Sequence, residues 1–144
     1  MEKIKDFSTE GAVINGIKNY TPKEALFELQ NGAVLIDLRR DAEVAYKAFD
    51  VPETIYSSPN ELKENFQNLP VDKPLIIADN AGVRSRQITE FLLENNFSKI
   101  ANLSGGMFEW DRNNLPILIN NKERLSGSCL CMLKPMNKVR NKED

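Results

Sequence analysis

A short loop that begins with a carboxylate is where chemistry is most expected in this sequence. Leu75 to Ala78 form an apolar run typical of a strand buried on both faces. From Ser85 onward, apolar residues recur at helical spacing. The connection is short and must turn tightly, and Gly82 is free to adopt a positive φ. Loop amides and a helix N-terminus together favour an anion, and Asp79 stands at the strand end.

Composition places the chain among ordinary globular proteins. Of its 144 residues, 41% are apolar and 28% are charged, which fits one domain with a buried core and a tail. No run approaches the roughly 20 apolar residues that a membrane-spanning helix needs, and the first residues lack an apolar signal core. The formal charge of −2 disfavours a nucleic-acid-binding surface over the whole molecule. We therefore expect a cytoplasmic protein that binds neither membrane nor nucleic acid.

The absence of histidine narrows the chemistry further. It excludes every Ser-His and Cys-His mechanism and the commonest metal ligand, and we expect no cofactor or metal. The two cysteines, Cys129 and Cys131, lie near the end of the chain, so no disulfide can join parts of the core. Residues 122–144 carry six basic and three acidic side chains, a net +3, which leaves −5 for the remainder. This difference would favour contact between the tail and the acidic body.

The rest of the chain alternates predicted helices and strands. Thr21, Pro22 and Glu24 have the types and spacing of a capped helix start. After a strand predicted at 33–36, Asp41 is expected to cap a short helix. The other expected elements are an edge strand at 12–14, a short strand around 55–56, helices at 60–68 and 85–95, a strand at 99–103 and a last helix that follows Gly105 and Gly106.

This alternation predicts an α/β fold with an open, mostly parallel central sheet covered by helices on both faces. Ligands of such folds bind at the carboxyl ends of the strands, where Asp79 is expected. Met107, Phe108 and Trp110 lie at helical spacing and are expected to pack in the core.

Three stretches of the chain resemble, in order and spacing, the rhodanese domain, a sulfurtransferase module that moves a sulfur atom through a cysteine persulfide. Residues 35–39, with Glu43 behind them, resemble the family's Asp-x-Arg stretch before a Glu. Residues 79–85 resemble its active-site loop of Cys, four residues, Arg and Ser, and residues 103–110 its Gly-Gly-x-x-x-Trp ending. The resemblance implies a single rhodanese-like domain at 21–118, with an extension at 1–20 and a Cys-x-Cys tail at 119–144.

One departure from the family pattern affects the chemistry directly. The family's Gly and Arg fall on Gly82 and Arg84, whereas its sulfur-carrying Cys falls on Asp79. A persulfide needs a polarisable thiolate, and a carboxylate is a weak nucleophile towards sulfur. The four residues between Asp79 and Arg84 resemble the sulfurtransferase loop rather than the five-residue loop of related phosphatases. The resemblance therefore implies a pseudoenzyme loop made of Asp79, Asn80, Ala81, Gly82, Val83 and Arg84.

Two roles are open for Asp79. Its carboxylate could occupy the cradle meant for an anion, accept amide hydrogen bonds and pair with Arg84. It could instead accept a phosphoryl group or act as a general base, but no second carboxylate has metal-site spacing nearby. We favour the first role, and we expect Asp37, Arg39 and Glu43 to form a structural polar network.

The tail also leaves several roles open. Cys129 and Cys131 have basic neighbours in Arg124 and Lys134, which could lower a thiol pKa if the tail is exposed. The pair could carry sulfur or electrons, form half of a four-thiolate metal site completed by a second chain, or have no chemical role.

Two functional hypotheses follow from these residues. The first is a non-catalytic binding or regulatory module that recognises a partner protein or a small anionic or sulfur-containing ligand. The second is a sulfurtransferase or thiol-redox protein that uses Cys129 or Cys131 in place of the missing loop thiol.

Mass spectrometry of the tail after thiosulfate treatment separates the two hypotheses. A non-catalytic module leaves Cys129 and Cys131 unmodified and shows no turnover, which is the result we expect. A persulfide on either thiol would favour the second hypothesis, because only a thiolate can hold the transferred sulfur.

Overall fold

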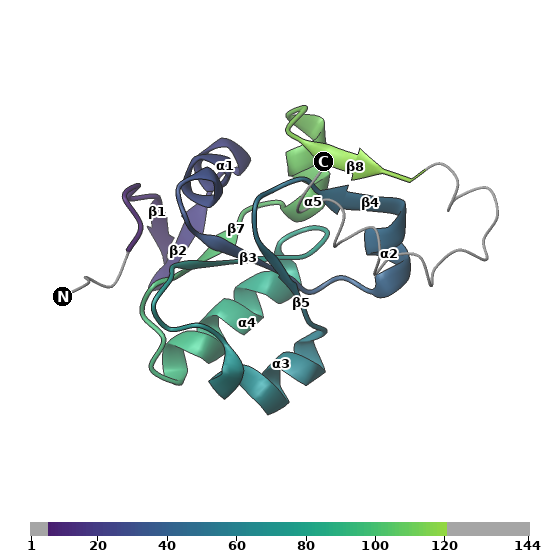
Figure 1. The fold of residues 1–144 in the computed structure, drawn as a ribbon. Helices are drawn as coiled ribbons and strands as arrows, with labels where there is room; N and C mark the ends of the chain where they lie inside the picture. Colours follow the sequence, from purple (N-terminus) through teal and green to yellow (C-terminus); the bar gives the residue numbers. More distant parts are fainter. Residues whose placement is uncertain (1–5, 121–144) are drawn as a thin grey trace.

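A computed structural model describes residues 6–120 and has a six-stranded sheet at its centre (Figure 1). The strands lie in the order β1-β2-β7-β6-β3-β5, and within this sheet only β1 runs antiparallel to its neighbour. The strands of this sheet are β1 (Ala12–Ile14), β2 (Ile17–Tyr20), β3 (Val34–Asp37), β5 (Thr54–Tyr56), β6 (Leu75–Ala78) and β7 (Ile100–Leu103). A separate antiparallel pair is formed by β4 (Lys47–Phe49) and β8 (Ile117–Ile119).

Helices cover both faces of this sheet (Figure 1). The side chains of α1 and α5 pack in one core cluster, and those of α3 and α4 pack in the other. Within residues 6–120, no helix is long and apolar enough to cross a membrane. The helices are α1 (Pro22–Gln30), α2 (Asp41–Tyr46), α3 (Pro59–Asn65), α4 (Val83–Glu94) and α5 (Gly106–Arg112), with a 3₁₀ turn η1 (Phe66–Asn68) after α3. The predicted α/β fold is confirmed.

Alternation along the buried strands divides the core into two layers. In β3, Leu35 faces α1 and α5, whereas Val34 and Ile36 face α3 and α4. Both layers are apolar, so the central strands are hydrophobic at nearly every position rather than at alternate positions. Trp110 is fully buried in the first layer, where its ring packs edge-on against Phe49.

Local sequence signals account for most helix starts. The Thr21 hydroxyl accepts the Glu24 N–H at 3.2 Å, and the Glu24 carboxylate accepts the Thr21 N–H at 2.9 Å, as the capping pattern predicts. The expectation for Asp41 is wrong, because Arg40 is the cap residue and Asp41 is the first helical residue. The expectation that Phe108 packs in the core is also wrong, because this residue of α5 is 65% exposed.

A buried carboxylate ties the segment before β1 to the domain. Glu28 on α1 is 3% exposed and accepts hydrogen bonds from Ser8 N–H at 3.2 Å, Ser8 Oγ at 3.0 Å and Thr9 N–H at 2.6 Å. Burial alone would raise the pKa of Glu28, but these hydrogen bonds outweigh it and lower the pKa. The carbonyl of Thr9 accepts a hydrogen bond from Tyr20, so the segment is held at two points.

The substitution Glu28→Gln tests this attachment. We expect it to destabilise the protein by about 1–3 kcal/mol near neutral pH, because a charged acceptor of three hydrogen bonds is lost. The lowered pKa makes this contribution complete above the unfolded-state pKa and lost as pH falls through the folded-state pKa. Urea unfolding at several pH values should therefore show the two proteins converging in acid, and a difference independent of pH would contradict the assignment.

Candidate functional site

The loop that follows β6 lies at the carboxyl edge of the sheet. β6 is paired on one side with β3 and on the other with β7, so Asp79 follows a central strand, as the sequence predicts. The helix after the loop starts at Val83, two residues before the predicted start. Gly82 is the cap residue and has a φ of +91°, the left-handed conformation that a tight turn requires here.

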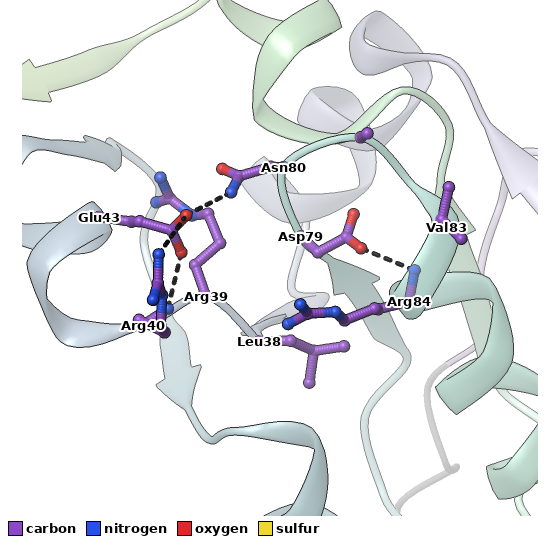
Figure 2. A pocket seen from close by; sticks show the side chains of 9 residues that line it. Leu38, Arg39, Arg40, Glu43, Asp79, Asn80, Val83 and Arg84 are labelled. Atoms are coloured by element: carbon purple, nitrogen blue, oxygen red, sulfur yellow. Dashed lines mark hydrogen bonds and ion pairs between the residues drawn. The ribbon is translucent and has the colours of Figure 1, made fainter.

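The loop amides point at the side chain of Asp79. This residue is only 7% exposed. One carboxylate oxygen accepts the Gly82 N–H, and the other accepts Arg84 N–H at 2.8 Å and Ser85 N–H at 3.2 Å. The expected pairing with the Arg84 guanidinium is wrong, because Arg84 contacts Asp79 through its backbone N–H (Figure 2). The cradle for an anion is therefore filled from within by a carboxylate attached to the loop itself.

Gly106 allows the start of α5 to pack closely against this loop. The first amides of α5 donate to loop carbonyls, with Met107 N–H to Asp79 O at 2.9 Å and Phe108 N–H to Asn80 O at 3.0 Å. A Cβ on Gly106 would overlap the backbone of Asp79 and Asn80. Gly106 thus serves a close backbone approach, whereas a Cβ on Gly105 would meet the Glu109 side chain; both glycines have a positive φ, which fits a tight turn from strand to helix.

A chain of buried polar side chains lies beneath the loop, and no local pattern in the sequence predicts it. Ser85 Oγ donates to Asn102 Oδ1 at 2.5 Å, Asn102 Nδ2 donates to Asn19 Oδ1 at 2.8 Å, and Asn19 donates to the Ile17 carbonyl at 2.9 Å. All three side chains belong to buried residues, so each hydrogen bond satisfies a group that would be costly to leave alone. The chain joins β2, β7 and α4 at the level of Asp79.

A cavity of about 410 Å³ opens above the loop. Its walls come from the loop, from the first turn of α4 and from the connection between β3 and α2 (Figure 2). Three arginines and two carboxylates lie among its lining residues, which are Leu38, Arg39, Arg40, Glu43, Asp79, Asn80, Ala81, Val83 and Arg84. The structure thus brings five of the six loop residues singled out by the sequence, all except Gly82, to one cavity.

The expected polar network separates into two groups. Asp37 and Arg39 form a buried ion pair with distances of 2.9 and 3.0 Å, and the Arg39 guanidinium lies over the Phe49 ring. This pair is structural, because both side chains are almost fully shielded from solvent.

Glu43 belongs to the cavity instead. Its carboxylate accepts Arg40 N–H at 2.9 Å and Asn80 Nδ2 at 2.7 Å, and so joins α2 to the loop (Figure 2). Burial alone would raise the pKa of Glu43, but these hydrogen bonds and the charges of Arg40 and Arg39 lower it. Glu43 is therefore ionised at neutral pH and fixed in place.

The candidate thiols Cys129 and Cys131 lie outside the described residues. Between residues 6 and 120, no group of three or more His, Cys, Asp or Glu side chains could hold a metal ion. The chemistry open to the described site is therefore that of the carboxylates, the guanidinium groups and the backbone amides.

Comparison with known proteins identifies the family. The sequence model of the Rhodanese-like domain matches residues 21–113, so the chain belongs to the rhodanese family. Thiosulfate sulfurtransferase GlpE of Haemophilus influenzae is 33% identical over 101 residues, which cover 69% of this chain and 93% of that protein. A sulfurtransferase of Allochromatium vinosum is 26% identical over 106 residues, which cover 74% of this chain and 96% of that protein.

Solved structures agree with this assignment. A rhodanese-related protein of Thermoplasma volcanium matches with a TM-score of 0.63 and 22% identity, and covers 71% of this chain and 98% of its own. The polysulfide-sulfur transferase homodimer of Wolinella succinogenes matches with a TM-score of 0.62 and 28% identity, over 71% of this chain and 78% of its own. The single rhodanese-like α/β domain is therefore shown by both sequence and fold.

The glycine contact between α5 and the loop can be tested with a matched pair of substitutions. Gly106→Ala should destabilise the protein by about 3 kcal/mol or more, because a methyl group must overlap the loop backbone and the residue has a positive φ. Gly16→Ala also has a positive φ but meets no atom within 4 Å, so only about 1 kcal/mol is expected. Urea unfolding of both variants measures the difference, and equal losses would rule out the close approach.

Proposed function

We propose that this chain is a rhodanese-like domain that binds a ligand at its loop and does not transfer sulfur there. The single observation that carries the proposal is the position of the Asp79 carboxylate, which fills the amide cradle of the loop. The proposal assigns Asp79 to the position of the family's sulfur-carrying Cys, and treats residues 21–118 as the domain and 119–144 as the tail.

The chemistry of a carboxylate supports the absence of sulfur transfer. Sulfur transfer through a persulfide requires a thiolate that attacks the outer sulfur of the donor and then holds it. Asp79 has no sulfur, and its oxygens are engaged by the N–H groups of Gly82, Arg84 and Ser85. A donor anion would meet both a weak nucleophile and a negative charge at the bottom of the cavity.

The intact architecture around the loop supports a binding role. The close contact with Gly106, the bridge from Glu43 to Asn80 and the buried chain below Ser85 all hold the loop in one shape. A cavity lined by Arg39, Arg40 and Arg84 remains open above it. We infer that the cavity receives a partner protein's side chain or a small anionic ligand, because guanidinium groups are strong anion binders.

The substitution Asp79→Cys tests whether only the thiol is missing. It is made in a protein that also carries Cys129→Ser and Cys131→Ser, so that position 79 holds the one cysteine. We expect thiosulfate sulfurtransferase activity about tenfold or more above the parent, and a mass increase of one sulfur atom on the protein. The physical reason is that the loop N–H groups would then face a thiolate or its persulfide.

Asp79→Ser in the same background is the matched control, because it removes the carboxylate without adding a thiol. It should remain inactive. Turnover by the Cys-free parent that still carries Asp79 would disprove the proposal. Turnover by the wild type that is lost when Cys129 and Cys131 are removed would assign sulfur transfer to the tail.

A further inference from the structure

Arg84 lines the cavity, and its guanidinium takes no part in the contacts with Asp79. Its side chain extends from α4 above Leu38 towards the side of the cavity that carries Arg39 and Arg40 (Figure 2). No carboxylate in residues 6–120 forms an ion pair with it. Arg84 therefore presents a positive charge with free donors to whatever enters the cavity.

The other two guanidinium groups are already committed to different degrees. Arg39 is paired with Asp37 and buried, so it cannot turn towards a ligand without breaking that pair. Arg40 is largely exposed and lies 3.8 Å from the Glu43 carboxylate, a long contact that leaves most of its donors free. Arg84 and Arg40 are thus the two groups available to hold an anion.

A small inorganic oxyanion fits this cavity poorly. The amides of Gly82, Arg84 and Ser85 already bind the Asp79 carboxylate, so the oxyanion would have to displace a group that is covalently attached. Asp79 and the ionised Glu43 also lie in the wall and repel a dianion more strongly than a monoanion.

The wall also offers apolar surface. Ala81 and Val83 line the cavity and are exposed, with 55% of Val83 accessible, whereas Leu38 also lines it but is only 1% accessible. An inorganic ion gains nothing from these contacts, whereas an organic body gains free energy for each apolar group that it buries. The volume of about 410 Å³ falls in the range of sites for small molecules.

We propose that this cavity binds a small organic monoanion, a carboxylate on an apolar body, rather than an inorganic sulfur oxyanion. Arg84, with Arg40 opposite, holds the carboxylate, and Ala81 and Val83 contact the body. The inference rests on the proposed function, because it requires Asp79 to keep the loop amides occupied.

Titration of the full chain with acetate, hexanoate and sulfate at equal ionic strength tests the proposal, with binding followed by amide chemical shifts of the loop. Hexanoate should bind most tightly, gaining about fourfold over acetate for each methylene that becomes buried. Sulfate should not shift the loop amides of the wild type. In Asp79→Ser, where the amides are free, sulfate should shift them.

Two arginines on α4 provide a matched pair of variants. Arg84→Gln should weaken hexanoate binding by about tenfold or more, because a charged donor pair is lost. Arg86→Gln removes an equal charge from an exposed residue of the same helix that does not line the cavity, and should change binding by less than about twofold. Thermal unfolding of both variants checks that each is folded.

Three results would overturn the inference: sulfate binding to the wild type as tightly as hexanoate, no dependence on chain length, or equal effects of the two arginine substitutions. These failures are separate from failure of the proposed function, which is judged by sulfur transfer. An inactive protein that does not bind hexanoate would disprove only the ligand class, whereas wild-type sulfur transfer from the loop would disprove the proposed function.

Discussion

The contact between the start of α5 and the loop after β6 is the constraint on which the site depends. Because Gly106 has no side chain, the first amides of α5 reach the carbonyls of Asp79 and Asn80. This contact fixes the two peptide groups at the start of the loop, and the later amides of Gly82 and Arg84 donate to the Asp79 side chain. The loop that forms the cradle and one wall of the cavity is therefore anchored to α5 at its start.

Sequence reasoning found the fold because its signals are local. The buried strands are apolar runs, and the capping residues Thr21 and Glu24 lie three apart, so both can be recognised without tertiary information. Strands β4 and β8 are not predicted by the sequence analysis. Each has only three residues and so carries little periodicity, and their pairing joins segments far apart in the chain. The prediction that Phe108 is buried is wrong for a related reason, because helical spacing alone does not show which apolar residues of a helix are covered by the rest of the fold.

The site was predictable in composition but not in its contacts. The strand, the glycine and the helix identified the loop from Asp79 to Arg84, and the resemblance to rhodaneses supplied its place in the fold. Nothing local connects Asn19 with Asn102, which are 83 residues apart and meet only because β2 lies beside β7. The sequence likewise does not show that Asp79 contacts Arg84 through the backbone N–H rather than the guanidinium.

The buried chain below the loop has a fixed direction. The Ile17 carbonyl can only accept, so Asn19 must donate to it, Asn102 must donate to Asn19, and the Ser85 hydrogen must go to Asn102. Ser85 Oγ also lies 3.4 Å from Asp79 Oδ1, a long contact, so the carboxylate there is held chiefly by the shorter hydrogen bonds from backbone amides. Backbone amides are present whatever the neighbouring side chains are, so the shape of this loop is separable from the reactivity of the residue that it encloses.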